Sequence, residues 1–229
     1  TLLHLDDTLT FMIDRVSLTF EQRLIKRLFD LFFSIVVLLI TWPIMFGCWI
    51  AVRLDSPGPG IYKQLRITQN GRFFNILKFR TMFSDAEAQS GPVIAAQDDP
   101  RITRVGRFLR RAKLDELPQF WNVLKGDMSV VGPRSERPYF VDRFSRDIEG
   151  YTQRFNVKAG ITGYAQIVGN YETSAEDKLR FDLIYIRSYS LMQDIRLIFE
   201  TVRLILTPRL YNRTFVDKLK ELHRKRKSS

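Results

Sequence analysis

One stretch of the chain carries almost no polar side chains. Between residues 28 and 52 the only charged residue is Asp30, and residues 31–52 form an apolar run of 22 residues. About 20 apolar residues suffice for a helix to cross the hydrocarbon core of a bilayer. The run begins well inside the chain and lacks an obvious small-residue cleavage site, which argues against a cleavable signal peptide. The pattern therefore predicts a membrane helix in preference to a buried helix of a soluble protein.

A proline stands near the middle of this run. Pro43 cannot donate the helical hydrogen bond and its ring crowds the preceding turn, so we expect a kink. Basic residues flank both ends of the run. Because such residues tend to stay on the cytoplasmic side, they favour a re-entrant helix over residues 22–54 that enters and leaves by the same face. An ordinary kinked span is the alternative, since membrane helices tolerate proline.

The remaining pattern predicts a folded body attached to this anchor. The turn formers SPGPG (residues 56–60) should end the helix, and alternation in residues 60–82 predicts short strands. Residues 87–100 resemble a loop. Apolar residues at helical spacing, bordered by arginines, predict an amphipathic helix over residues 101–113. The expected fold is α/β and membrane-associated: a kinked re-entrant N-terminal helix, amphipathic interfacial helices and a small mixed cytoplasmic domain with short strands.

This organisation gives the chain four parts. Residues 1–21 form a lead-in that looks helical from residue 5, and residues 55–208 form the folded domain. A further amphipathic helix near its end should stop at Pro208. Residues 209–229 form a basic tail, in which residues 213–229 carry a net charge of about +5, and it is either a solvated terminus or a contact for anionic lipid.

Composition narrows the classes of function. The net charge of +11 indicates acidic partners, such as phosphorylated substrates, anionic membrane lipids or nucleic acid. No nucleic-acid-binding signature is present, so nucleic acid is not expected. Cys48 is the only cysteine, and the two histidines, His4 and His223, stand near opposite termini. Disulfide-dependent secretion and a His/Cys zinc site are therefore not expected.

The candidate chemistry centres on two adjacent carboxylates. Asp115 and Glu116 precede Pro118, which fits only the first turn of a helix, so Asp115 should be the N-cap of a helix reaching Lys125. A cap alone would be a structural role. The same position keeps a carboxylate ionised and attracts phosphate. Two such carboxylates can then divide the work of nucleophile and Mg²⁺ ligand.

Three motifs occur in order behind the membrane segment: KFRTM (residues 78–82), LDELPQFWNVLKGDMSVVGPR (residues 114–134) and KAGITGYAQ (residues 158–166). Together they resemble the bacterial sugar transferases known as monotopic polyprenyl-phosphate phosphoglycosyl transferases, over roughly residues 21–208. The resemblance implies transfer of a sugar 1-phosphate from a UDP-sugar to polyprenyl phosphate. UMP would leave, and a covalent aspartyl-phosphosugar intermediate would form.

The resemblance also implies roles for single residues. Asp115 matches the nucleophile and Glu116 its acidic partner, assigned to Mg²⁺. The candidates for substrate binding are Lys78, Arg80, Pro133, Arg134, Lys158 and Asp182. Pro43 matches the proline that breaks the membrane helix.

Three positions depart from the family pattern. Ser135 replaces the second proline of Pro-Arg-Pro, and Lys158-Ala159 replaces Arg-Pro before glycine, losing the two-pronged phosphate contact of an arginine. Trp42 stands where a small hydroxyl residue is common, although Thr41 could bond a freed carbonyl instead.

Each supporting residue also has a plain structural interpretation. Lys78 and Arg80 could be the solvent side of a strand. Arg134 could pair with Glu136, and Asp182 could pair with Arg180 or Arg187. A non-catalytic membrane-anchored scaffold and a single-step transfer without a covalent intermediate stay open.

The family also sets expectations about context. It implies the inner membrane of a bacterium, with the catalytic domain on the cytoplasmic face. The first residue is Thr1, and larger members carry extra N-terminal helices, so a longer parent protein is expected. Glucose or galactose is expected by analogy with those members, and a homodimer is conceivable.

Overall fold

The computed structural model describes residues 3–5, 8–10, 17–84, 86, 99–169 and 173–207. The helices are α1 (Phe20–Asp55), α2 (Arg104–Arg111), α3 (Gln119–Lys125), α4 (Pro138–Asp147), α5 (Tyr164–Val168), α6 (Ala175–Arg187) and α7 (Leu191–Leu206). The strands are β1 (Leu3–Leu5), β2 (Thr8–Thr10), β3 (Ile61–Ile67), β4 (Phe73–Phe79), β5 (Met128–Val131) and β6 (Ala159–Thr162). Short 3-10 helices are η1 (Gln69–Gly71), η2 (Leu114–Glu116) and η3 (Tyr151–Asn156).

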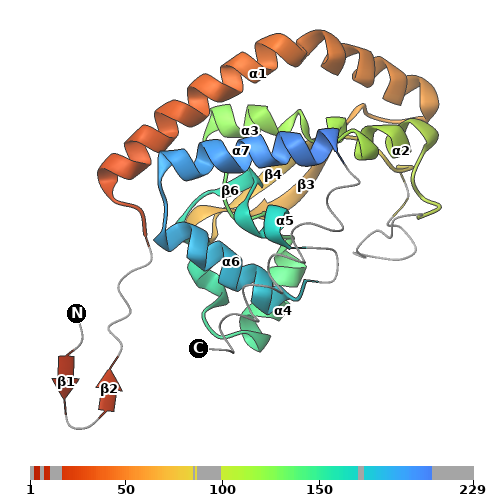
Figure 1. Ribbon diagram of the computed structural model, residues 1–229. Coiled ribbons are helices and arrows are strands. Elements are labelled where there is room, and N and C mark those ends of the chain that lie inside the picture. The colour runs from red at the N-terminus through yellow and green to blue at the C-terminus, as the bar shows by residue number, and fades with distance from the viewer. Residues whose placement is uncertain are drawn as a thin grey trace.

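Helix α1 is one continuous helix that starts and ends where the sequence predicts. Thr19 and Gln22 form a capping box at its start, and Ser56 of the SPGPG turn caps its end. Figure 1 shows the helix bending along its length as it arches over the rest of the fold. Of its most apolar window, 17% is buried within the protein. Such a helix does not belong to the core of a soluble protein, and its composition suits a membrane.

The bend has two local causes. Pro43 lies inside the helix and lacks the N–H that would reach the carbonyl of Leu39. Thr41 Oγ1 donates to Val37 O at 2.7 Å, a contact that itself tends to bend helices. The prediction that Thr41 would bond the freed carbonyl is therefore wrong, because its partner is the carbonyl of Val37 rather than that of Leu39.

The body beneath α1 contains small sheets between layers of helices (Figure 1). Strands β3 and β4 pair antiparallel from Ile61↔Phe79 to Ile67↔Phe73, whereas β5 and β6 pair parallel, with Met128 opposite Ala159. The largest apolar core joins β4, α3, β5 and α6 and includes Phe74, Phe120, Val123, Val131 and Tyr185. The predicted short strands are thus confirmed.

Two predictions about local structure are wrong. The lead-in is not helical from residue 5, because Thr8–Thr10 pairs with Leu3–Leu5 as an antiparallel ribbon; among its described residues only Phe20 and Glu21, at the start of α1, are helical. Helix α3 starts at Gln119 with Pro118 as its N-cap, so Asp115 does not cap it. Asp115 lies one turn earlier, in η2. The basic tail, Pro208 and most of the predicted loop at residues 87–100 lie outside the described residues.

Amphipathic helices lie on the side of the body that faces α1. In Figure 1, α2, α3 and α7 form this layer. Its exposed apolar side chains include Phe108 on α2, Trp121 on α3, and Met192, Ile195, Phe199 and Leu206 on α7. Exposed apolar side chains on the same side as a membrane helix suit an interfacial surface.

Helix α2 packs closely against the chain just after β4 because Gly106 has no side chain. A Cβ on Gly106 would stand 2.1 Å from the carbonyl oxygen of Thr81, whereas a Cβ on Gly47 of α1 would meet nothing within 4 Å. This close approach brings the end of α2, and the carboxylates that follow it, next to β4.

We expect Gly106→Ala to destabilise the protein by about 1–3 kcal/mol, because the added methyl must push α2 off the backbone of Thr81. Gly47→Ala is the matched control: it is also a helical glycine, and there the better helix propensity of alanine should leave stability equal or slightly higher. Thermal unfolding of both variants in lipid nanodiscs measures the difference. Equal unfolding temperatures would show that the approach of α2 is not tight.

Candidate active site

Three separate segments bring their polar side chains to one place. Lys78 comes from β4, Asp115 and Glu116 come from η2, and Arg134 comes from the loop that follows β5. Glu116 Oε1 accepts hydrogen bonds from Lys78 Nζ and from Arg134 Nη2, both at 2.8 Å. The structure therefore joins the cores of two predicted motifs. Lys78 does not face solvent, and Arg134 pairs with Glu116 rather than with Glu136.

The backbone of η2 sets the two carboxylates in different directions. Lys113, just before it, adopts a left-handed conformation with φ of 56°. Helix α3, which continues the chain, is tied to the outer edge of β4 by Asn122, which accepts from Leu77 N and donates to Asn75 O, each at 2.9 Å. This bond fixes η2 beside the strand that carries Lys78.

The pKa values of the two carboxyl groups shift in opposite directions. Burial alone would raise the pKa of Glu116, but Arg134 and Lys78 together hold it well below its ordinary value. Burial raises the pKa of Asp115, and the neighbouring charge of Glu116 raises it further, against the opposing effect of Lys78, Lys113 and Arg110. Glu116 is thus a fixed anion, whereas Asp115 is a carboxylate in a desolvated position.

Asp115 differs from Glu116 in its hydrogen bonding. Within the described part of the chain no donor hydrogen-bonds its carboxylate, although the residue is only 8% exposed. A carboxylate that is desolvated and not committed to a donor retains its lone pairs for reaction or for a ligand. This arrangement favours a nucleophile over the capping role that the residue could have had.

Arg110 and Lys113 are site residues that the sequence did not reveal. Both are among the cations that act on Asp115. Arg110 Nε donates to Thr81 Oγ1 at 2.8 Å, and its remaining nitrogens have no hydrogen-bond partner among the described residues. The sequence predicts a basic interfacial helix over residues 101–113 that leads to Asp115 and could gather anionic lipid and substrate phosphates, but the pattern does not single out these two residues. The available signal was the spacing of Arg110 and Lys113, five and two residues before Asp115.

A second layer fixes the backbone of Arg134. Pro133 O accepts from Gly160 N at 2.9 Å, and Arg154 donates to Arg134 O at 3.0 Å. Arg154 also forms a buried ion pair with Asp182 at 2.7 Å. Burial raises the pKa of Asp182 to about 6, although Arg154 opposes the shift. Asp182 pairs with neither Arg180 nor Arg187. It is linked through Arg154 to the backbone of Arg134.

Two of the predicted substrate-binding residues are placed elsewhere. Arg80 is buried and donates to the carbonyls of Val52, Ser56 and Pro57, so its guanidinium caps the end of α1. Burial lowers the pKa of Lys158, and the charged groups that most affect it are Arg27, Asp30, Arg72 and Asp127. Neither carboxylate of the pair is among them.

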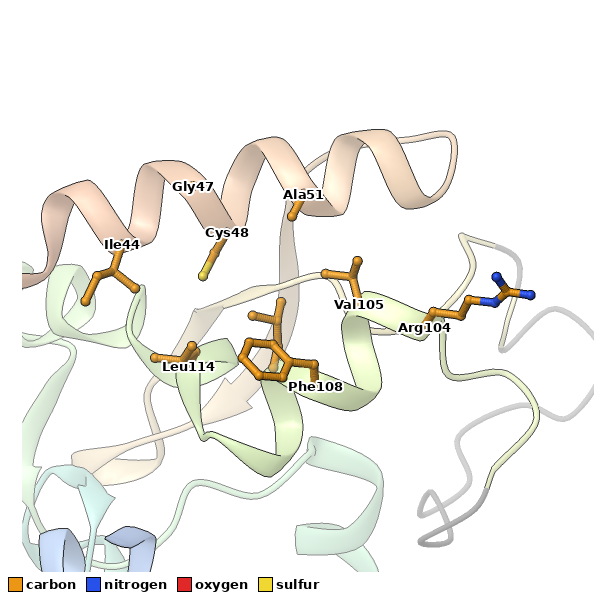
Figure 2. A pocket seen from close by; sticks show the side chains of 9 residues that line it. Ile44, Gly47, Cys48, Ala51, Arg104, Val105, Phe108 and Leu114 are labelled. Atoms are coloured by element: carbon orange, nitrogen blue, oxygen red, sulfur yellow. The ribbon is translucent and has the colours of Figure 1, made fainter.

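An apolar groove ends beside the carboxylate pair. It has a volume of about 620 Å³ and lies between the second half of α1 and helix α2. In Figure 2, Val105, Phe108 and Leu114 point up towards Ile44 and Cys48 of α1, and Arg104 lies at one end. Leu114, at the other end, directly precedes Asp115. The groove therefore leads from the exposed apolar part of α1 to the site.

The described residues contain no cluster of three or more side chains that could hold a metal ion by themselves. Both cations bond Oε1 of Glu116, so Oε2 has no hydrogen-bond partner in the described structure. One carboxylate oxygen beside a free carboxylate fits Mg²⁺, which commonly takes one or two protein ligands and completes its shell with water and substrate phosphates.

Comparison with known proteins gives a consistent set of relatives. The family described as bacterial sugar transferase matches residues 21–208. A UDP-N-acetylgalactosamine-undecaprenyl-phosphate N-acetylgalactosaminephosphotransferase of Aeromonas hydrophila is 43% identical over 186 residues, covering 80% of this chain and 44% of that protein. The UDP-glucose:undecaprenyl-phosphate glucose-1-phosphate transferase of Escherichia coli (strain K12) is 45% identical over 186 residues, covering 79% of this chain and 40% of that protein. The chain therefore spans less than half the length of these two relatives.

We expect opposite stability changes from removing the two adjacent charges. At neutral pH Asp115→Asn should stabilise the fold, because the raised pKa means that ionised Asp115 is disfavoured in the folded state. The gain should shrink as the pH falls towards about 4, where the unfolded chain also becomes protonated. Thermal unfolding at pH 7 and pH 5 measures this.

Glu116→Gln should instead destabilise the fold at pH 7 by roughly 1–3 kcal/mol, because Lys78 and Arg134 lose their anion. Since the pKa of Glu116 is depressed, its contribution is present above about pH 4.3, the unfolded value, and is lost as the pH falls through the lower folded value. The exposed Glu149→Gln is the matched control and should change little. Changes of equal sign at Asp115 and Glu116 would contradict the assignment.

Proposed function

The chain belongs to the bacterial sugar transferase family, and on this basis we propose that it transfers a sugar 1-phosphate from a UDP-sugar to undecaprenyl phosphate or a related polyprenyl phosphate. The observation that carries the proposal is the position of Asp115. Its carboxylate accepts no hydrogen bond within the described residues, is influenced by the cations Lys78, Lys113 and Arg110, and directly follows Leu114 at the end of an apolar groove. A non-catalytic scaffold would have no use for a desolvated carboxylate in this place.

The reaction that we propose has two displacement steps at one phosphorus atom. An oxygen of Asp115 attacks the β-phosphorus of the UDP-sugar, a new oxygen–phosphorus bond forms, and the bond to the bridging oxygen breaks as UMP leaves. A phosphate oxygen of the acceptor then attacks the same phosphorus. That step releases the Asp115 carboxylate and leaves the sugar on a polyprenyl diphosphate. Each step uses the carboxylate as nucleophile or leaving group and needs no oxidant or other co-reactant.

Positioning and charge neutralisation supply most of the rate in such phosphoryl transfers. Arg110 and Lys113 act electrostatically on Asp115, and the side-chain donors that they leave unbonded among the described residues suit the phosphates of the UDP-sugar. Lys78 and Arg134 are held by Glu116, so they keep a fixed position before the substrate arrives. Glu116 Oε2 would hold Mg²⁺, which would supply further neutralisation of phosphate charge.

The apolar groove suits the hydrocarbon chain of the acceptor. Its only charged lining residue among those described is Arg104 at its end, and it leads to Leu114. A polyprenyl chain in this groove would place its phosphate next to Asp115. The membrane helix and the exposed apolar side chains of α7 would hold the body at headgroup depth, on the cytoplasmic face of the bacterial inner membrane.

The experiment follows UMP release by purified protein in nanodiscs with Mg²⁺, undecaprenyl phosphate and each of UDP-glucose, UDP-galactose and UDP-N-acetylgalactosamine. Asp115→Asn should abolish release, and Glu149→Gln should leave it unchanged. The intact mass of the protein incubated with donor alone should increase by one sugar phosphate in wild type only. Release without this adduct would favour direct transfer, and no release with any of the donors would reject the proposal for them.

The groove gives a separate prediction. Gly47→Leu should raise the KM for undecaprenyl phosphate about tenfold or more, because the added side chain fills the groove. The KM for the donor should change little. Ile40→Phe is the control, since it adds bulk at an exposed position of the same helix that does not line the groove. An unchanged acceptor KM in Gly47→Leu would place the hydrocarbon chain elsewhere.

A further inference from the structure

Helix α1 carries a buried polar stripe that its apolar sequence does not require. Lys26, Asp30 and Ser34 follow one another at intervals of four residues, on one face of the helix, and are 6%, 2% and 0% exposed. Charged groups at the edge of a membrane segment are costly unless they are paired. Lys26 and Asp30 bond groups of the body, whereas Ser34 Oγ has no hydrogen-bond partner among the described residues. The first half of α1 is therefore docked onto the body partly by polar contacts.

Asp30 accepts a backbone hydrogen bond from one edge of β5, as a neighbouring strand would. Its Oδ1 accepts hydrogen bonds from Val130 N at 2.9 Å and from Ser129 Oγ at 3.0 Å, 100 and 99 residues away in the sequence. Strand β5 pairs with β6 on its other edge. Without Asp30 the buried N–H of Val130 would lose its acceptor, which is an expensive loss in the interior.

A second polar link reaches the same strand. Lys26 pairs with Asp194 of α7 at 2.6 Å, with both side chains buried. Tyr185 OH donates to Asp194 at 2.7 Å and lies 3.3 Å from Val131 O. Asp30 is therefore connected to β5 directly, and Lys26 is connected through Asp194 of α7 to Tyr185 of α6, whose hydroxyl lies against β5.

Strand β5 leads directly to the site. Only three residues separate Val130 from Arg134, and this connection is held by Gly132 N bonding Thr162 O at 2.8 Å and Gly160 N bonding Pro133 O at 2.9 Å. Such a short, bonded connection transmits a displacement of the strand to the arginine that contacts Glu116.

We propose that Asp30 is a positioning residue: by bonding Val130 and Ser129 it holds β5 so that Arg134 reaches Glu116, and it thereby makes assembly of the site depend on docking of the membrane helix. The role in catalysis rests on the proposed function. The physical coupling between α1 and the Arg134 loop does not.

The kinetic test compares Asp30→Leu with Asp30→Asn, which keeps an acceptor for Val130. Asp30→Leu should lower kcat/KM about tenfold or more, and Asp30→Asn should restore most of it. Combined with Arg134→Gln, Asp30→Leu should add little, because both changes act through one contact. Arg23→Gln is the control on the same helix: the Arg23 side chain hydrogen-bonds only Leu18 O among the described residues, so activity should be unchanged. Independent losses in the double variant would overturn the positioning role.

Hydrogen exchange provides a test that needs no activity. In nanodiscs, amides of residues 128–136 should exchange faster in Asp30→Leu than in wild type, while those of β3 and β4 should be unchanged. Ser129→Ala removes one donor to Asp30 and should give a smaller change of the same sign, which serves if Asp30→Leu fails to fold. Unchanged exchange in both variants would overturn the proposal. Faster exchange in Asp30→Leu, together with a wild type that is inactive with every donor, would instead reject the proposed function and leave the coupling supported.

Discussion

The contact on which the site depends is that of Glu116 with two cations at once. Lys78 and Arg134 bond the same carboxylate oxygen, and neither residue is near Glu116 in the sequence. This three-way contact joins the β3–β4 hairpin, the turn after α2 and the loop after β5. The two cations would repel each other at this separation, so the anion between them is needed for all three segments to meet. The two adjacent carboxylates therefore have different roles. Glu116 holds the three segments of the site together, and Asp115 is not needed for that contact.

This arrangement makes the ionised form of Asp115 less stable. It is desolvated, next to a fixed anion and without a donor, which are the conditions under which a carboxylate is least stable. The protein tolerates this because Glu116 supplies compensation one residue away, and because Arg110 and Lys113 keep positive charge nearby. A reactive phosphate would relieve the same cost by bringing negative charge to those cations and a bond to the carboxylate. Destabilised groups of this kind are characteristic of working sites rather than of scaffolds.

The sequence predicted much of the fold because the strongest signals were local. Helix α1, the SPGPG turn, the β3–β4 region and the amphipathic helices follow from apolar pattern and turn residues. Errors arose where a partner lies far along the chain. Lys78 and Arg80 look alike in the sequence, yet the strand ends at Phe79, so one side chain reaches Glu116 and the other caps α1. Asp182 had two arginines nearby in sequence and pairs with neither, because η3 brings Arg154 to it. The Asp115 cap failed because a 3-10 turn separates it from α3, and no simple spacing rule reports such a turn.

The geometry also explains why a membrane helix belongs to this site. Leu114 and Asp115 are consecutive residues, but the first lines an apolar groove and the second faces a cluster of cations. The proposed reaction between a water-soluble nucleotide sugar and a lipid-linked phosphate would need such a boundary between two solvents within a few ångströms. Helix α2 alone cannot provide it, since one helix face does not make a groove. The second half of α1 supplies the opposite wall, while its first half is fixed to β5 through Asp30. One bent helix thus forms the apolar side of the boundary with its second half, and its first half is attached to β5, the strand that leads to the polar side. Both contacts require the two halves of α1 to lie at an angle, and the bend provides that angle.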